Sequence, residues 1–234
     1  KGVLFSMASP IELELAKLIH EVIPNAEMVR FMKTGEDANL SNIRLARAHT
    51  KRDMILTSGY HGYPDWFAVE ESPNNGVPEM LKDYVKVIPW GNLEVAEKLI
   101  RQYNERIACV ISIPYDMNED VSGSYIKHIR KLTKEYGILL VLDEVWTGFR
   151  LALGGAQEYF GVDPDLASYA KAMANGYPIS TYVGKRKYMS ELNQFRMTTT
   201  YAGETLSMAA AIATISIMKR EPVHKHLWAM GERL

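Results

Sequence analysis

Two ionisable side chains follow short apolar segments at points where a strand is expected to end. Asp143 comes directly after the run ILLVL, in the segment DEVWTGFR. Lys171 comes just after LASY, in the segment SYAKAMANGYP. Taken singly, Asp143 could be a helix cap, a metal ligand or a cofactor anchor, and Lys171 could be a solvated surface charge. Glu144 points the other way along the strand and is expected to be structural.

The two side chains together indicate a more specific chemistry. An acid and a lysine at the ends of neighbouring strands are what pyridoxal-phosphate chemistry requires, because the lysine forms a Schiff base and the carboxylate pairs with the ring nitrogen. Small residues and the turn NGYP around Lys171 leave space for its amine. We therefore interpret Asp143 and Lys171 as a candidate pyridoxal-phosphate site.

An alternation of strands and helices must position these side chains. Ser9 and Pro10 can begin a helix that ends at Pro24, and further helices are expected at about 38–49, 92–104, 122–136 and 204–220. Short apolar or alternating segments predict strands at 28–32, 54–57, 84–88, 107–113, 138–142, 166–169 and 180–184.

The fold class follows from the most continuous apolar segments. IACVISI and ILLVL are apolar on both faces, as in central strands of a sheet that helices cover on both sides. The sequence therefore predicts an α/β fold, a three-layer sandwich with a mostly parallel central sheet. Ligands of such sheets bind at the carboxyl ends of the strands, where Asp143 and Lys171 are expected. Nothing marks an internal domain boundary.

Composition excludes several classes of protein. The 234 residues carry 27 basic and 28 acidic side chains, and a net charge of −1 argues against a nucleic-acid binder that works by bulk charge. A hydrophobic content of 47% excludes disorder. Cys109 is expected to be a buried core thiol, and the scattered histidines predict no metal site. No membrane helix or signal peptide is recognised, so we expect a cytoplasmic protein.

Five segments carry a resemblance to a known family. TGEDANLSNIRLAR, YHG, DEVWTGFR, AKAMANGYP and TTYAGETLSMAAA occur in the order and spacing of the class III pyridoxal-phosphate aminotransferases. The sequence most resembles the branch that contains glutamate-1-semialdehyde aminomutase. The resemblance implies a fold type I large domain over residues 1–234. Family members are nearly twice as long, so we expect this chain to be a fragment without the N-terminal segment and the C-terminal small domain of the family.

The resemblance also implies roles for residues near the cofactor ring. Lys171 would hold pyridoxal 5'-phosphate as a Schiff base, and Asp143 would keep the ring nitrogen protonated. Val145 resembles the residue that packs on one face of the ring, and Tyr60 the aromatic residue that stacks on the other. His61 either acts in the site or holds the loop, and the sequence leaves both open.

Further residues are implied for the phosphate of the cofactor. Thr34, Gly35 and Glu36 occupy the turn before a helix expected to begin near Asp37, where free amides and the helix dipole favour an anion. Thr200 resembles the threonine that reaches the phosphate of the neighbouring subunit. The resemblance therefore implies a homodimer with two sites across one interface.

Three positions depart from the family pattern. Glu36 stands where the family has a hydroxyl residue, Ile113 where it has a glutamate, and Glu204 where it has an asparagine. We expect these changes to leave the cofactor chemistry intact and to alter the accepted substrate. A weakened phosphate site is the other possible outcome of Glu36.

The implied function is transfer of an amino group between an amine donor and an aldehyde or keto acceptor, both small molecules. The alternatives are an aminomutase that acts within one substrate, another pyridoxal-phosphate reaction such as decarboxylation or epimerisation, and a noncatalytic dimerisation module. Glu36 and the short chain are the only support for the last alternative.

Overall fold

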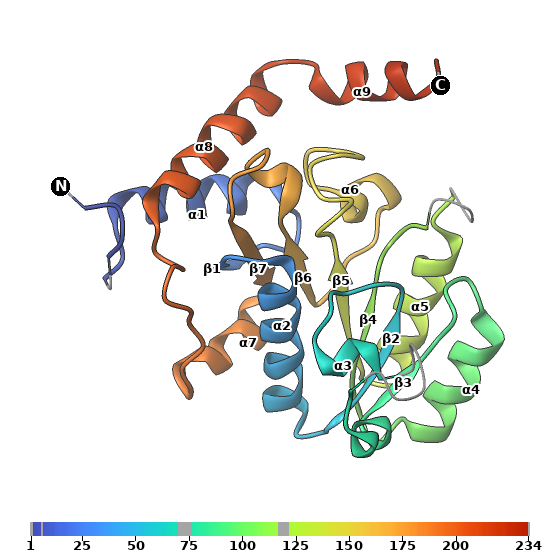
Figure 1. Ribbon diagram of the computed structural model, residues 1–234. Coiled ribbons are helices and arrows are strands. Elements are labelled where there is room, and N and C mark those ends of the chain that lie inside the picture. The colour runs from blue at the N-terminus through green and yellow to red at the C-terminus, as the bar shows by residue number, and fades with distance from the viewer. Residues whose placement is uncertain (1, 6, 70–75, 117–121, 234) are drawn as a thin grey trace.

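The computed structural model describes residues 2–5, 7–69, 76–116 and 122–233, and a seven-stranded sheet lies at its centre (Figure 1). The strand order is β1-β7-β6-β5-β4-β2-β3. Each of the seven expected strands is confirmed: β1 (Met28–Met32), β2 (Met54–Ser58), β3 (Val85–Val87), β4 (Ile107–Ser112), β5 (Leu139–Asp143), β6 (Leu166–Tyr169) and β7 (Ser180–Gly184).

The direction of the strands determines where the loops meet. Strands β3, β2, β4, β5 and β6 pair in parallel, whereas β7 is antiparallel to both β6 and β1. Strand β7 is thus the reversed one, and β1 runs in the same direction as β6. The carboxyl ends of β1, β2, β4, β5 and β6 therefore lie along the same edge of the sheet. The expectation of a mostly parallel sheet is confirmed.

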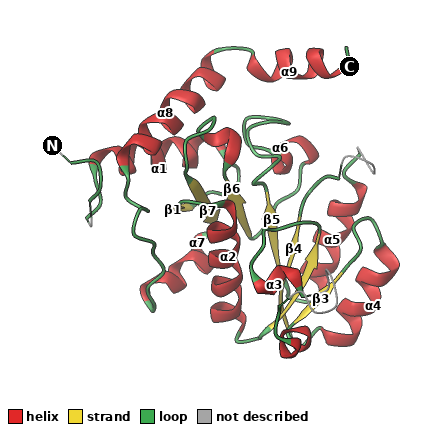
Figure 2. Ribbon diagram, in the orientation of Figure 1, coloured by secondary structure: helices red, strands yellow, loops and turns green. Residues whose placement is uncertain are grey.

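Helices cover both faces of the sheet (Figure 2). Helices α1, α4, α5 and α8 pack on one face, and α2, α3 and α7 pack on the other. The three-layer α/β architecture is confirmed. The helices are α1 (Pro10–Val22), α2 (Gly35–Thr50), α3 (Asp65–Ala68), α4 (Leu93–Tyr103), α5 (Ser124–Glu135), α6 (Ala156–Phe160), α7 (Arg186–Met189), α8 (Thr205–Arg220) and α9 (Val223–Gly231).

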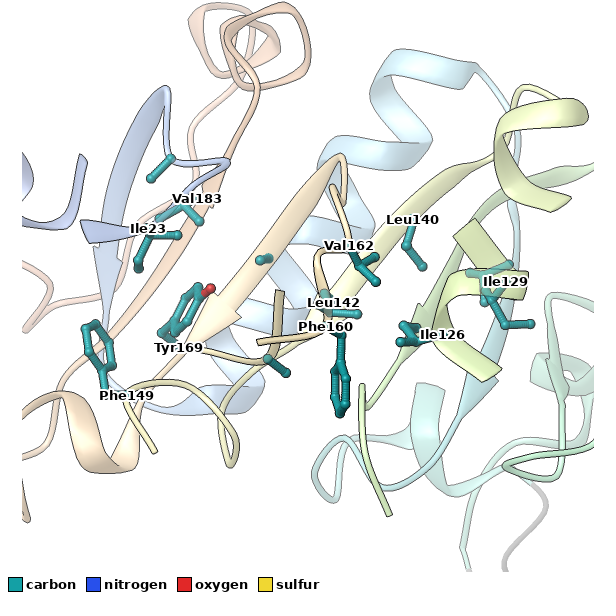
Figure 3. Close-up of a cluster of buried hydrophobic side chains, with 14 of the residues drawn as sticks. Ile23, Ile126, Ile129, Leu140, Leu142, Phe149, Phe160, Val162, Tyr169 and Val183 are labelled. Atoms are coloured by element: carbon teal, nitrogen blue, oxygen red, sulfur yellow. The ribbon is translucent and has the colours of Figure 1, made fainter. Parts of the chain in front are cut away.

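The alternation of side chains along a strand divides the core into two clusters. Leu140 and Leu142 of β5 point to one face and pack with α5, as Figure 3 shows for Ile126 and Ile129. Val141, between them in sequence, belongs to the cluster under α2. Because β5 buries both faces, its continuous apolar sequence is explained. Within the described residues, no helix is both long enough and apolar enough to span a membrane.

Helix α2 begins earlier than the sequence indicates. It starts at Gly35, whereas the expected start was near Asp37. The reason is a reciprocal cap, in which the Asp37 amide donates to Thr34 Oγ1 at 3.2 Å and the Thr34 amide donates to Asp37 Oδ2 at 3.0 Å. An aspartate at this position closes the capping box as glutamate usually does. The first turn of α2 is therefore built from the TGED segment itself.

Candidate active site

A cavity of about 410 Å³ lies at the carboxyl edge of the sheet. Residues after β1, β2, β4, β5 and β6 line it, because the carboxyl ends of these strands meet there. Eight of the nine predicted site residues are among the lining residues: Thr34, Gly35, Glu36, Tyr60, His61, Asp143, Val145 and Lys171. Thr200, the ninth, is exposed and is not one of them.

The Asp143 carboxylate is held by three hydrogen-bond donors. Its Oδ2 accepts from Asn39 Nδ2 at 2.8 Å and lies 2.7 Å from His61 Nδ1, and its Oδ1 accepts from the Val145 amide at 3.0 Å. The Asp143 side chain is only 4% exposed. Three donors offset the loss of water around this buried carboxylate.

His61 contacts Asp143 through a defined nitrogen. Because the carboxylate oxygen is an acceptor, the proton of the imidazole that faces it is on Nδ1. The imidazole is fully buried, and its Nε2 has no hydrogen-bond partner among the described residues. His61 therefore contacts the carboxylate directly while its ring packs near Phe67, with 5.3 Å between ring centroids.

Lys171 has an uncommon backbone conformation. Its φ of 44° is in the left-handed region, in the short 3₁₀ turn 171–173 that follows β6. A non-glycine residue pays a conformational free energy of about 1–3 kcal/mol to adopt such a backbone, and such residues cluster at active sites. The side chain is exposed, and Nζ has no hydrogen bond or ion pair within the described part of the chain. Its amine is accessible at the cavity.

The first turn of α2 forms another wall of the cavity. The amides of Gly35 and Glu36 are in the first helical turn, where no intrahelical acceptor exists, and the positive end of the helix dipole favours an anion. Gly35 also packs against Val145, since a Cβ at Gly35 would lie 2.6 Å from Val145 Cγ1. Only glycine permits this approach.

Apolar and aromatic groups complete the cavity. Val145 and Trp146 follow β5, Tyr60 follows β2, and Ile113 follows β4. Tyr60 is 70% exposed, so most of its ring is free for contact with a ligand. Ile113 packs against Gly59, where a Cβ would lie within 2.4 Å of its side chain. An apolar side chain therefore occupies the position at which the family pattern has a glutamate.

Glu204, a second departure from the family pattern, has a structural role. It caps α8 by accepting from the amides of Leu206 and Ser207, and its Oε2 lies 3.0 Å from Lys33 Nζ. Burial opposes its ionisation, but hydrogen bonds from Ser207, Lys33 and the two amides lower the pKa of Glu204 to about 2. The carboxylate joins α8 to the segment that precedes Thr34.

Glu144 is structural, as the sequence suggested. It is fully buried and accepts from Thr147 Oγ1 at 2.6 Å and from the amides of Ala156 and Gln157 at 2.7 Å. Burial raises the pKa of Glu144 to about 7, against the opposite effect of these hydrogen bonds. The side chain connects the end of β5 to the first turn of α6. The raised pKa of Glu144 therefore reflects its burial in a structural position outside the cavity.

A larger hollow of about 1080 Å³ adjoins the cavity. Thr34, Gly35, Ala170 and Lys171 line both spaces. The larger one extends between Phe149–Leu151 and helices α8 and α9, with Leu227 and Trp228 among its apolar lining residues. Lys171 therefore stands where the small cavity meets the open hollow.

Two residues of the site were not singled out from the sequence. Asn39 and Ser168 are buried and join the Asp143 network through Asn39 Oδ1, which accepts from Ser168 Oγ. Asn39 lies four residues after Gly35 and so on the same face of α2. The sequence offered no clear signal for Asn39, because other polar residues such as Ser41 and Asn42 are buried on the same helix. Ser168 had no signal either, because LASY reads as an ordinary strand.

The comparisons with known proteins agree with one another. The aminotransferase class-III family model matches residues 4–234. The chain is 36% identical to glutamate-1-semialdehyde 2,1-aminomutases of Sulfurihydrogenibium azorense and Persephonella marina, over 100% of its own length and 58% of theirs. It thus spans little more than half the length of these curated relatives.

Solved structures give the same result. An omega-transaminase from Sphaerobacter thermophilus matches with a TM-score of 0.85 and 28% identity, covering 92% of this chain and 55% of that one. A structure described as a transaminase with PLP bound matches with a TM-score of 0.87 and 27% identity, covering 93% and 55%.

Proposed function

The chain belongs to the class-III aminotransferase family, and from this membership we propose that it is the cofactor-binding large domain of a pyridoxal-phosphate enzyme that transfers amino groups. The observation that carries the proposal is the cavity that gathers Lys171, Asp143 and the first turn of α2. When bound, pyridoxal phosphate supplies an aldehyde that condenses with amines and a protonated ring that accepts electrons.

The residues present fit this cofactor. An accessible amine, a buried carboxylate with three donors, and a helix N-terminus with free amides line one cavity. Lys171 would hold the cofactor covalently, and Asp143 would hold the proton of the ring nitrogen. The amides of Gly35 and Glu36, with Thr34, would bind the phosphate. Val145 and Tyr60 would pack on opposite faces of the ring.

The side chains of this chain would then have distinct tasks in amino transfer. The Nζ of Lys171 would be free to move a proton once the amine donor occupies the cofactor aldehyde, and it would carry the α-proton of the substrate to the carbon of that aldehyde. This requires a mobile amine, and Lys171 stands where the cavity meets the open hollow. Asp143 would hold the proton on the ring nitrogen, which keeps the ring able to accept electrons.

Glu36 is the lining residue whose charge opposes phosphate binding at this site. Its carboxylate lies at the wall of the cavity, where a Cβ on Gly62 would come within 3.0 Å of Oε2. A carboxylate beside a phosphate is repulsive, so the side chain would have to turn away from the bound anion. We propose that the free amides of α2 outweigh this repulsion.

We propose a homodimer in which Thr200 reaches the phosphate of the partner's site. The exposure of Thr200 in the single chain is compatible with such a contact. The sequence-based location in the cytoplasm stays a prediction.

Two outcomes of the amino transfer are compatible with the same residues. The amino group passes to a separate carbonyl acceptor in a transaminase, and it returns to the same carbon skeleton in an aminomutase. The second candidate is favoured by the aminomutase names of the relatives at 36% identity. Glutamate 1-semialdehyde as sole substrate, compared with pairs of amines and keto acids, distinguishes the two.

The cofactor site is tested by adding pyridoxal phosphate, reducing with borohydride and mapping the modified lysine. We expect the label on Lys171 and none after Lys171→Ala. Lys33→Met is the matched control, because Lys33 also lines the larger hollow but its amine is bound to Glu204. Label on another lysine, or no label on folded protein, would contradict the assignment.

A further inference from the structure

The hydrogen bonds around Asp143 leave one acceptor position of its carboxylate free. A carboxylate has about four lone-pair positions, two on each oxygen. Both positions of Oδ2 are occupied, by Asn39 Nδ2 at 2.8 Å and His61 Nδ1 at 2.7 Å. Oδ1 accepts one hydrogen bond, from the Val145 amide at 3.0 Å. The free position is therefore on Oδ1, on a side chain that lines the cavity.

Asn39 is itself held in one orientation. Its Oδ1 accepts from the Ser168 hydroxyl, and its Nδ2 donates both to Asp143 and to the His61 carbonyl, the latter at 3.3 Å. A flip of the amide would place its oxygen against the Asp143 carboxylate and its NH₂ against the hydroxyl. The Asp143 carboxylate and the His61 carbonyl only accept, so they fix which end of Asn39 faces Asp143, and the Ser168 hydroxyl supports that orientation by donating to Oδ1.

The backbone elements hold this arrangement in place. Ser168 on β6 is the register partner of Asp143 on β5, so both are at the same level of the sheet. Asn39 lies on α2, one turn after Gly35, and the rise of the helix is about 1.5 Å per residue. The same rigid helix therefore places the free amides at its N-terminus and the donor to Asp143.

We propose that Asn39, supported by Ser168, and His61 are positioning residues that occupy Oδ2 of Asp143 and leave Oδ1 for the ring nitrogen of the cofactor. The proposal rests on the proposed function for the identity of the ligand. The hydrogen-bond relay from Ser168 through Asn39 to Asp143 is a property of the chain itself, and it can be measured without cofactor.

The test uses Ser168→Ala, which removes one buried hydroxyl and little volume, and Asn39→Ala. Ser58→Ala is the matched control, because Ser58 is another fully buried serine at the end of a strand of the same sheet, with its hydroxyl 2.8 Å from Tyr125. The first measurement is the nuclear magnetic resonance signal of the His61 Nδ1 proton in cofactor-free protein. The second is the dissociation constant of pyridoxal phosphate.

We expect a downfield, slowly exchanging His61 Nδ1 proton in the parent protein and in Ser58→Ala. In Ser168→Ala the resonance should shift or broaden, and the cofactor should bind about tenfold more weakly, as for loss of support to a hydrogen bond with a charged group. Asn39→Ala should have a larger effect, on the order of 100-fold. If Asn39→Ala does not fold, Ser168→Ala decides.

An unchanged resonance and an unchanged dissociation constant in Ser168→Ala would overturn the relay. Absence of the downfield proton in the parent protein would do the same. A parent protein that shows the resonance and its loss in Ser168→Ala but does not bind the cofactor would support the relay and contradict the proposed function. The failures of the two proposals are therefore distinguishable.

Discussion

Glu204 offers the sharpest test of how this chain departs from its family. The side chain caps α8 and also pairs with Lys33, whose Nζ lies 3.0 Å away, and the two side chains are 17% and 14% exposed. Glu204→Ala removes both interactions. Glu204→Asn restores the residue of the family pattern and keeps a good helix cap, but its neutral amide cannot form the ion pair with Lys33.

The magnitudes follow from the two interactions. Loss of an N-cap costs about 1 kcal/mol, and loss of a partly buried charged hydrogen bond costs about 1.5 kcal/mol. We therefore expect Glu204→Ala to lower the free energy of unfolding by about 2–3 kcal/mol and Glu204→Asn by about half as much. For a chain of this size the melting temperature should fall by roughly 2–4 °C per kcal/mol.

The contribution of Glu204 should also depend on pH. Burial opposes ionisation, but the hydrogen bonds from Ser207, Lys33 and the backbone amides lower its pKa to about 2 from an ordinary 4.5. A depressed pKa in the folded state gives stability that is complete above the unfolded pKa and is lost as pH falls toward 2. The difference between the parent protein and Glu204→Ala should therefore be constant above about pH 5 and shrink below it.

Urea unfolding at several pH values measures these differences. Lys33→Met is the control for the ion pair. In a protein that already carries Lys33→Met, the further substitution Glu204→Asn should change the free energy of unfolding much less than it does in the parent protein. The reasoning is refuted if Glu204→Ala is within about 0.5 kcal/mol of the parent protein at pH 7, the usual range of a surface substitution. It is also refuted if Glu204→Asn is as unstable as Glu204→Ala.

Three further predictions concern the core and the cavity. Asp143→Asn should still bind pyridoxal phosphate on Lys171, seen as visible absorbance, but lose most amino-transfer activity, because a neutral amide does not keep the ring nitrogen protonated; near-normal rates would argue against this role. Gly35→Ala should weaken cofactor binding, measured by titration, because its Cβ would lie 2.6 Å from Val145 Cγ1 and overpacking costs about 1–3 kcal/mol; parent-like affinity would show that α2 can shift freely. Cys109 should resist thiol reagents until the protein unfolds, since burial raises the pKa of its thiol to about 12; labelling of the folded protein would contradict its place in the core.

Much of the fold was predictable because local patterns and the tertiary structure agree. The run ILLVL is apolar on both faces because β5 is buried between α2 and α5, and each predicted strand belongs to the sheet. Gly137 follows α5 with φ of 62°, a left-handed conformation that glycine adopts without strain, so the helix ends close to the expected position 136. The start of α2 was misplaced because the cap is formed by an aspartate at position 37 and not by the more usual glutamate.

The sequence by itself also determined which residue types stand at the strand ends, among them Asp143 and Lys171. Tertiary structure decided which of them share a cavity and what holds them there. His61, Asn39 and Ser168 are 82, 104 and 25 positions from Asp143 along the chain, yet they form one network with it. Parallel strands bring distant loops to one edge, and hydrogen-bond partners across that edge leave no periodic signal in sequence.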